Sequence, residues 1–197
     1  MKPNPVSPAA RRRFLSRCAA LPVLLALPAA AQQRAATPAC GGDGPTPPQT
    51  EGPFFTPASP QRTSLLETGL PGRRIVVAGT VLSSRCRPLA GVLLDFWQAD
   101  DAGAYDNAGF RLRGHQFSDA AGRYRLETIV PGLYPGRTRH IHVKLGLAGR
   151  AVLTTQLYFP GEAANRRDFL FDRRLLLSAA GGEAGAPARF DFVLQGD

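Results

Sequence analysis

The sequence of 197 residues contains only three cysteines, three histidines and two lysines, and it has no apolar run long enough to cross a membrane. The longest such run, residues 18–31, is about 14 residues long, whereas a transmembrane helix needs roughly 20. No basic stretch is interleaved with aromatic residues, so the sequence gives no indication of nucleic-acid binding. Stable membrane insertion and a nucleic-acid partner are therefore not expected.

The formal net charge of +9 is concentrated at the N-terminus. Residues 1–31 contain five basic residues and no acidic residue, so they carry +5 of this charge. The remaining 166 residues carry +4, which is ordinary for a globular domain. The basic character of the chain therefore belongs largely to its first segment and does not indicate an acidic partner.

The first 31 residues have the pattern of a signal peptide. A basic start is followed by the apolar run and by Ala29-Ala30-Ala31 before Gln32, which is typical of a cleavage site. Arg11-Arg12-Arg13-Phe14-Leu15 resembles the twin-arginine consensus, with an ordinary Sec signal as the alternative. We expect the twin-arginine translocase to export the folded chain to the periplasm or the medium.

Two cysteines, Cys40 and Cys86, follow the predicted signal peptide. In an oxidising compartment such a pair usually forms a disulfide, with two free thiols as the alternative. Closing this loop of about 46 residues would stabilise the fold by about 4 kcal/mol. The bond would connect an irregular N-terminal arm, residues 32–60, to a catalytic domain over residues 61–197.

Short alternating apolar segments predict an all-β fold. Glycine and proline together make up 39 residues, which favours many turns and few long helices. The expected strands lie at residues 75–81, 91–97, 123–128, 139–147, 152–159 and 190–194. Ser64–Glu67 has capping-box spacing, and residues 163–178 are the only expected helix. We therefore predict a prealbumin-like β-sandwich core with irregular loops and at most short helices.

One turn pattern occurs twice, with a tyrosine after each copy. Asp100-x-Ala102-Gly103-x-Tyr105 and Asp119-x-Ala121-Gly122-x-Tyr124 both read as aspartate–glycine turns. Tyr124 alternates with Leu126 and is expected in the core. Tyr105 lies in a longer loop, where functional side chains are more common.

Two of the histidines form a His140-Ile141-His142 pair. On a strand, residues i and i+2 point to one face, so both imidazoles could hold one metal ion, although a structural histidine pair has the same pattern. There is no cysteine pair for a tetrahedral zinc site, and His115 is read as a polar strand or loop residue. The nearest oxygen donor in sequence is Tyr134, held between Pro131-Gly132 and Pro135-Gly136, and tyrosinate is a hard ligand suited to Fe(III).

Several blocks together resemble the intradiol ring-cleavage dioxygenases, the family of protocatechuate 3,4-dioxygenase and catechol 1,2-dioxygenase. The resemblance covers roughly residues 50–168, and the blocks agree in order and spacing. They are residues 49–55, 95–100 with 103–106, 111–114, 122–135, 137–142 and 154–159.

This resemblance implies a β-sandwich enzyme with one non-haem Fe(III) per chain. Carried over by motif, the iron ligands are Tyr105, Tyr134, His140 and His142, while Arg137 and Gln156 line the substrate pocket. In the family the ligand at the position of Tyr134 is released when substrate binds. The implied reaction cleaves the ring of a catechol between its two hydroxyl-bearing carbons with O2 and gives a cis,cis-muconate-type product.

The chain also departs from the family pattern. It lacks the long N-terminal helical segment of the catechol 1,2-dioxygenases, and Arg139 stands before the first histidine where the family often has alanine. Arg139 would favour an anionic catechol if it points inward, and it would have no such effect if it faces solvent. Two other functions remain open, a non-catalytic prealbumin-like binding module and a zinc or copper protein that uses the histidine pair.

Overall fold

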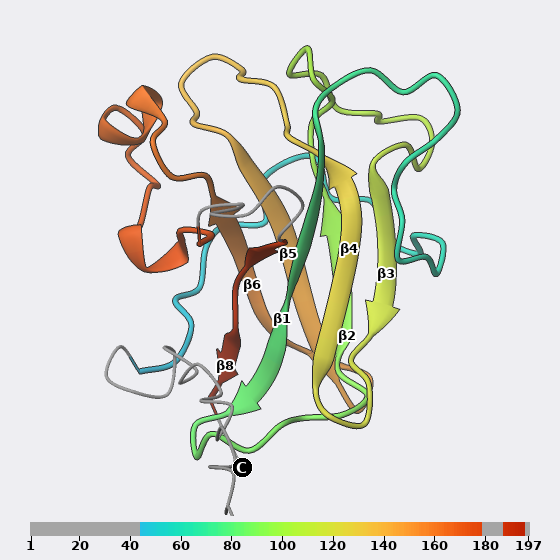
Figure 1. Cartoon of the computed structure of the whole chain (residues 1–197), viewed down its shortest axis with the longest axis vertical. Coiled ribbons are helices and arrows are strands. Elements are labelled where there is room, and N and C mark those ends of the chain that lie inside the picture. The colour runs from blue at the N-terminus through green and yellow to red at the C-terminus, as the bar shows by residue number, and fades with distance from the viewer. Residues whose placement is uncertain (1–43, 179–186, 196–197) are drawn as a thin grey trace, which may run out of the picture. The chain divides into compact units, whose positions relative to one another are not determined.

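Strands make up nearly all the regular structure of this computed structural model, which describes residues 44–178 and 187–195. Eight strands form two four-stranded sheets, and the remaining regular elements in these ranges are two short 3₁₀ helices (Figure 1). The strands are β1 (Arg74–Ser83), β2 (Leu93–Trp97), β3 (Arg113–Phe117), β4 (Arg123–Ile129), β5 (His140–Leu147), β6 (Arg150–Tyr158), β7 (Ala188–Arg189) and β8 (Phe192–Leu194). The 3₁₀ helices are η2 (Ala163–Arg166) and η3 (Arg173–Leu175). The predicted all-β class is confirmed.

The two sheets differ in how their strands pair. In the first sheet β1 is antiparallel to β4 and parallel to both β7 and β8. The second sheet has the order β3-β2-β5-β6, and all its neighbouring strands are antiparallel. Because β2 and β5 are neighbours, the end of β2 and the start of β5 lie side by side at one end of the sandwich (Figure 1).

The core lies between the sheets and is built from the alternating apolar residues of each strand. Val77 and Val81 of β1 contribute from the first sheet, and Phe96 and Ile141 contribute from the second. Tyr124 of β4 is 4% exposed, and its hydroxyl donates to the Phe190 carbonyl at 2.8 Å. The expectation that Tyr124 belongs to the core is confirmed.

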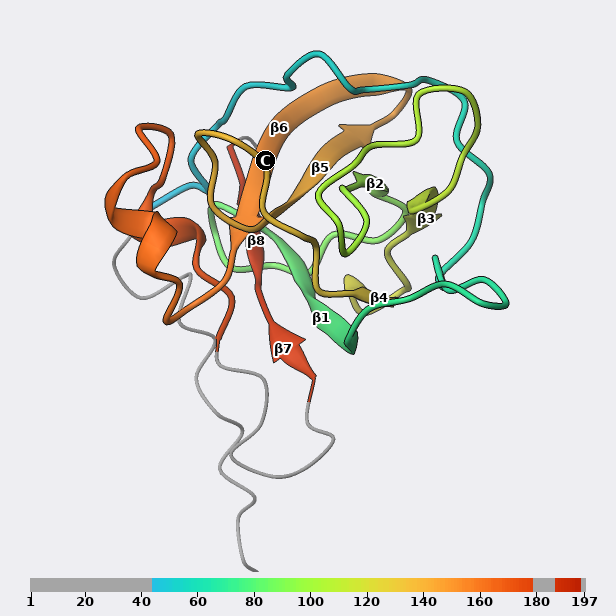
Figure 2. The same ribbon diagram turned by 90° about the horizontal axis from the view of Figure 1, so that it is seen from above.

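The segment before β1 follows the outer face of the second sheet. The backbone N–H of Gln49 donates to Thr154 on β6 at 2.8 Å, and the N–H of Arg62 donates to His115 on β3 at 2.8 Å. The chain between these two bonds crosses the whole sheet (Figure 2). The described part of the predicted arm, residues 44–60, is thus irregular but hydrogen-bonded to the sheet.

Two local predictions are wrong. Residues 163–178 form no α-helix, because the side chains of Asp168 and Asp172 accept the N–H groups of Leu170 and Arg174 and so replace helical hydrogen bonds. Ser64–Glu67 forms no helical turn either. Instead, the N–H of Leu65 donates to Glu127 on the edge strand β4, and this bond draws the segment alongside the sheet.

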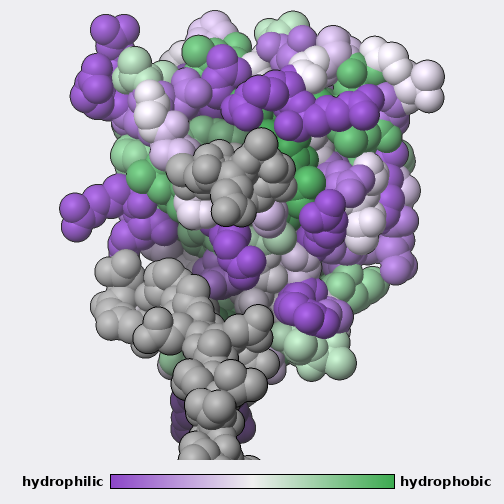
Figure 3. All heavy atoms as spheres, in the orientation of Figure 1, coloured by the Kyte–Doolittle hydropathy of each residue, from purple (hydrophilic) through white to green (hydrophobic). Residues whose placement is uncertain are grey.

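Residues 1–31, the predicted signal peptide, and Cys40 lie outside the described residues. Contacts divide the chain into residues 1–35 and 36–197, and every described residue belongs to the second unit. Cys86 is disulfide-bonded, while its predicted pairing with Cys40 stays a prediction. Within the described ranges no helix has the length and apolarity that crossing a membrane requires. The face shown in Figure 3 is largely hydrophilic, with small apolar groups between the polar side chains.

Candidate metal centre and substrate site

The two histidines stand at the start of β5 and point to the same side. Ile141 between them is buried in the core, so His140 and His142 face away from it, toward the segment that crosses the sheet. Both are 2% exposed, and their Nε2 atoms are 3.1 Å apart. Strand alternation alone therefore brings two imidazole nitrogens together.

Both imidazoles are held in the neutral form that can bind a metal ion. Burial, together with the positive charge of Arg137, lowers the pKa of His140 to about 4. Burial also holds the pKa of His142 well below its usual value. The Nδ1–H of His140 donates to the Thr138 carbonyl at 2.7 Å, which leaves the lone pair on Nε2 facing the site.

Tyr105 reaches the histidines from the loop after β2. The carboxylate of Asp100 accepts the N–H groups of Ala102 and Ala104, and this turn presents Tyr105 with its Oη 3.5 Å from Nε2 of His140. The Phe54 ring stacks on the Tyr105 ring at a centroid distance of 4.3 Å and an interplanar angle of 16°. The tyrosine is therefore held between its own turn and the segment that crosses the sheet.

The second copy of this turn confirms that the two aspartate–glycine patterns fold alike. Asp119 accepts the N–H groups of Ala121 and Arg123 in the same i+2 and i+4 arrangement. At Asp119 the turn joins β3 to β4 and sends its tyrosine into the core. Only the copy that begins at Asp100 delivers a tyrosine to the histidines.

Arg113 on β3 fixes the surroundings of Tyr105, a role that its sequence neighbours do not predict. Its guanidinium donates to the Asp106 carbonyl at 2.9 Å and 2.7 Å and to the Phe54 carbonyl at 2.6 Å. The residue is 1% exposed. Arg113 thus ties the loop that carries Tyr105 to the segment that carries its stacking partner.

Tyr134 joins the site through a direct contact between two backbone turns. The N–H of Gly132 donates to the Asp100 carbonyl at 2.6 Å. A Cβ on Gly103 would lie 2.2 Å from the Leu133 carbonyl oxygen, so only glycine fits at this position. The Tyr105 and Tyr134 rings consequently lie 5.8 Å apart in an edge-on arrangement.

Arg137 and Gln156 stand beside this tyrosine pair. Nη1 of Arg137 lies 3.3 Å from the Tyr134 hydroxyl, and Nη2 donates to Oε1 of Gln156. The Gln156 amide in turn donates to the Thr50 carbonyl at 3.0 Å, which fixes its orientation. The structure therefore brings together all six residues predicted for the site: Tyr105, Tyr134, Arg137, His140, His142 and Gln156.

Asp168 is a second residue of the site that the sequence does not predict. Its Oδ2 accepts Nε of Arg137 at 2.9 Å, and its side chain is 1% exposed. The N–H donors and the Arg137 charge hold the pKa of Asp168 below its usual value, although burial alone would raise it. Asp168 is 31 residues from Arg137, so no local pattern could have linked them.

Arg139 does not point into the site. Its guanidinium contacts Glu162 at 3.1 Å and donates to the Pro131 carbonyl. Arg139 ties the turn that carries Tyr134 to the segment after β6.

The donor set fits a ferric ion. Two nitrogen donors at about 2.1 Å from one metal ion and at right angles around it are about 3 Å apart, close to the observed 3.1 Å. Phenol oxygens beside them become hard anionic ligands on deprotonation, as Fe(III) requires. In the described part of the chain, no three His, Cys, Asp or Glu side chains cluster to hold a metal ion. The phenols are thus the oxygen donors next to the imidazoles.

A β-sandwich with two phenols and two imidazoles at one end defines a candidate mononuclear metalloenzyme. Residues 50–196 match the family model Dioxygenase_C, described as dioxygenase, and the chain belongs to this family. The relatives below place it among the intradiol dioxygenases, so the resemblance seen in the sequence is confirmed at the level of the family.

Curated relatives carry the names of several intradiol reactions. The protocatechuate 3,4-dioxygenase beta chain of Burkholderia cepacia is 38% identical over 118 residues, which cover 51% of this chain and 50% of that one. The hydroxyquinol 1,2-dioxygenase of Nocardioides simplex is 29% identical and covers 73% of this chain and 62% of its own. The chain therefore matches about half to three fifths of the length of these relatives.

Solved structures agree with the fold and with the family. The dioxygenase domain of a dioxygenase–carbohydrate-binding protein fusion from the cellulolytic bacterium Streptomyces sp. SirexAA-E is 59% identical, with a TM-score of 0.74. The match covers 78% of this chain and 99% of that domain. Catechol 1,2-dioxygenase from Pseudomonas arvilla C-1 is 29% identical, with a TM-score of 0.67, over 80% of this chain and 64% of its own.

Proposed function

We propose that this chain is an Fe(III)-dependent intradiol dioxygenase that cleaves a catechol ring between its two hydroxyl-bearing carbons and gives a cis,cis-muconate-type product. One observation carries the proposal. The Tyr105 hydroxyl and the Nε2 atoms of His140 and His142 converge at one end of the sandwich, with Tyr134 and Arg137 beside them.

The residues around this point divide the work. Bound Fe(III) would act as a Lewis acid that draws electron density from a catechol chelated through both oxygens. Tyr134 is suited to accept a proton from the incoming catechol, because its side chain is partly exposed and its hydroxyl lies 3.3 Å from Nη1 of Arg137. Tyr105 is suited to stay in place under the Phe54 ring. Arg137 can then stabilise negative charge on the reacting ring.

The first experiment loads the chain after the predicted signal, residues 32–197, with Fe(III) and records iron content, visible spectrum and catechol cleavage. We expect about one iron per chain and a tyrosinate-to-iron charge-transfer band. Tyr105→Phe should lose the band and the activity, and Tyr134→Phe should lower kcat at least about 100-fold by removing a proton acceptor.

Tyr124→Phe is the matched control, because it removes a hydroxyl that bonds only within the core. This variant should keep the band and the activity. A wild-type protein that stays colourless after loading with Fe(III) would overturn the proposal. So would loss of the band in Tyr124→Phe to the same extent as in Tyr105→Phe.

The proposed substrate is a catechol without a charged ring substituent. Three basic side chains near the site are already paired with carboxylates, and the buried guanidinium of Arg113 donates to the Phe54 and Asp106 carbonyls, so these groups offer little unpaired charge to a substrate carboxylate. These pairs are Arg137 with Asp168, Lys144 with Glu51 and Arg139 with Glu162. We expect catechol and hydroxyquinol to have a higher kcat/KM than protocatechuate, and steady-state kinetics on the three compounds tests this.

Export by the twin-arginine route completes the proposal. The support is the Arg11–Leu15 motif, the apolar run and the alanines before Gln32. Arg11→Lys combined with Arg12→Lys should block export of the folded chain in a bacterial host, and cell fractionation measures the outcome. Export that continues unchanged would instead indicate a Sec signal.

A further inference from the structure

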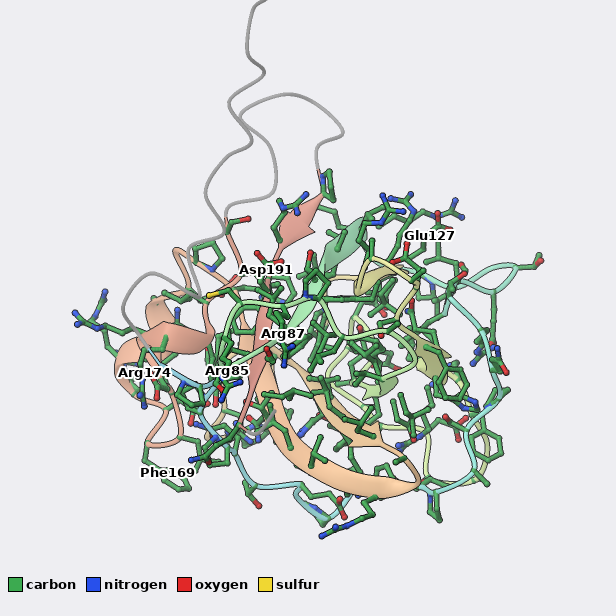
Figure 4. All side chains as sticks on the ribbon, turned by 90° about the horizontal axis from the view of Figure 1, so that it is seen from below. Arg85, Arg87, Glu127, Phe169, Arg174 and Asp191 are labelled. Carbon is green, nitrogen blue, oxygen red and sulfur yellow. The ribbon has the colours of Figure 1, made fainter. Side chains whose placement is uncertain are left out.

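The segment between β6 and η3 has opposite characters on its two sides. Its outer side carries Phe169, which is 86% exposed (Figure 4). Arg166 and Arg167 are exposed as well. Asp168, in the middle of these residues, is turned inward with its side chain 1% exposed. A buried carboxylate loses its hydration, so it needs hydrogen-bond donors or a cation as partners.

The first set of partners fixes the direction of Arg137. Oδ2 of Asp168 accepts Nε of Arg137 at 2.9 Å, and Oδ1 accepts the backbone N–H of Leu170 at 2.9 Å. Because a guanidinium is planar, holding Nε fixes where the other two nitrogens point. Those two nitrogens reach the Tyr134 hydroxyl and Oε1 of Gln156.

The second set of partners leads to His140. Oδ2 of Asp168 also accepts the backbone N–H of Thr138 at 2.9 Å, and the Thr138 hydroxyl donates to Asn165 at 2.6 Å. The Thr138 carbonyl accepts Nδ1–H of His140 at 2.7 Å. One segment behind the site thus holds both the arginine and the carbonyl that orients an imidazole.

We propose that Asp168 is a positioning residue, which aims Arg137 at the reacting substrate and acts on the reaction through Arg137. The proposal rests on the proposed dioxygenase function and extends it. Without Asp168, Arg137 would be a largely buried cation with no carboxylate partner, and its planar fork would turn away from Tyr134. Removing such an orienting partner typically lowers activity about 10–100-fold.

The test is a double-mutant cycle on the iron-loaded chain with Asp168→Asn, Arg137→Gln and the combination of both. Asp168→Asn keeps the size of the side chain and removes the charge. We expect this variant to lower kcat about 10–100-fold. In the Arg137→Gln background the same change should lower kcat by less than about twofold, because the residue that it orients is absent.

Asp172→Asn is the matched control. Asp172 belongs to the same segment, and its carboxylate pairs with Arg174 away from the site. Both variants lose one negative charge, so a general charge effect would appear in both. We expect Asp172→Asn to keep kcat and KM within about twofold.

A second measurement does not depend on turnover. Titration with 4-nitrocatechol, followed by its visible absorption, gives Kd, and release of iron to a chelator gives the stability of the metal site. A positioning role predicts that Asp168→Asn changes kcat more than Kd and leaves iron release within about threefold of wild type. Iron loss and a lowered Tm that account for the whole effect would indicate a purely structural role and overturn the proposal.

The cycle separates the two proposals. A wild-type chain that cleaves no catechol contradicts the dioxygenase function. An active wild-type chain in which the effects of Asp168→Asn and Arg137→Gln multiply shows that Asp168 does not act through Arg137, and the positioning role fails alone. Equal losses of kcat in Asp168→Asn and Asp172→Asn would also contradict the positioning role.

Discussion

At the scale of single residues, Gly103 sets the distance between the two phenols. A methyl group at this position would meet the Leu133 carbonyl at 2.2 Å, and φ is +86°. We expect Gly103→Ala to destabilise the protein by about 1–3 kcal/mol more than the left-handed backbone alone would cost. Denaturant unfolding measures the free energy of unfolding, and iron content reports whether the two tyrosines stay together.

Gly149→Ala supplies the control for this prediction. Gly149 has φ of +75° but no atom within 4 Å of its added Cβ, so it shares the backbone cost without the collision. It stands in the turn between β5 and β6 at the far end of β5 from the histidines. Equal destabilisation by the two variants would contradict the claim that the turns touch at Gly103.

Asp168 also predicts how stability depends on pH. Its pKa is lowered in the folded state by the N–H groups of Thr138 and Leu170 and by Arg137, against the effect of burial. A lowered pKa contributes stability above the unfolded value of about 3.9, and this contribution is lost as the pH falls through the folded pKa. The difference in unfolding free energy between wild type and Asp168→Asn should therefore be constant from about pH 5 to 7 and shrink below about pH 4. A difference that grows on acidification would contradict this sign.

At the scale of elements, the bonds that Arg139 makes to two loops decide what it can do next to the site. Arg139 faces away from His140 and holds Pro131 and Glu162 together. We expect Arg139→Met to leave the ratio of kcat/KM for protocatechuate to that for catechol within about twofold, and to lower stability by about 1 kcal/mol through the lost bonds. Kinetics with both substrates and thermal unfolding check the two parts. A ratio that changes tenfold would place Arg139 in the substrate site.

The sequence predicts those elements whose apolar residues alternate. Six expected strands correspond to β1, β2, β4, β5, β6 and β8. The sequence does not predict β3, because no apolar alternation is visible there. Its inward position at Gly114 has no side chain, and its outward residues Arg113 and His115 are polar. The expected helix at 163–178 fails because aspartate side chains take the backbone N–H groups there. Both failures are local: β3 has no apolar alternation in its own sequence, and the aspartates compete with helical hydrogen bonds two residues along the chain.

The site is predictable to the extent that it is local. The spacing of His140 and His142 puts both on one face, and the aspartate–glycine turn marks Tyr105. Arg113 and Asp168 act across 59 and 31 residues of sequence, on Phe54 and Arg137 respectively. Arg113 lies in the block 111–114, but nothing local indicates its contact with Phe54, and nothing near Asp168 indicates its contact with Arg137.

At the scale of the whole molecule, a covalent link involves Cys86, which is disulfide-bonded. If its partner is Cys40, as the sequence predicts, Cys40→Ser should lower the free energy of unfolding by about 4 kcal/mol in protein made under oxidising conditions. A peptide map without reductant should show Cys40 joined to Cys86. Treatment of wild type with reductant should lower its Tm to that of the variant. A map with Cys86 joined elsewhere would contradict the pairing.

The contact between the two glycine turns has a consequence for directed evolution. Main-chain atoms meet there, so the spacing of Tyr105 and Tyr134 does not depend on which side chains surround them. The partly exposed Leu133 and the exposed Pro53 can be exchanged without moving either phenol. A library that randomises these two positions and keeps the glycines should retain the charge-transfer band of the proposed iron enzyme in nearly every clone. The geometry of the two phenols is thus carried by the main chain, and exchange of the neighbouring side chains leaves it intact.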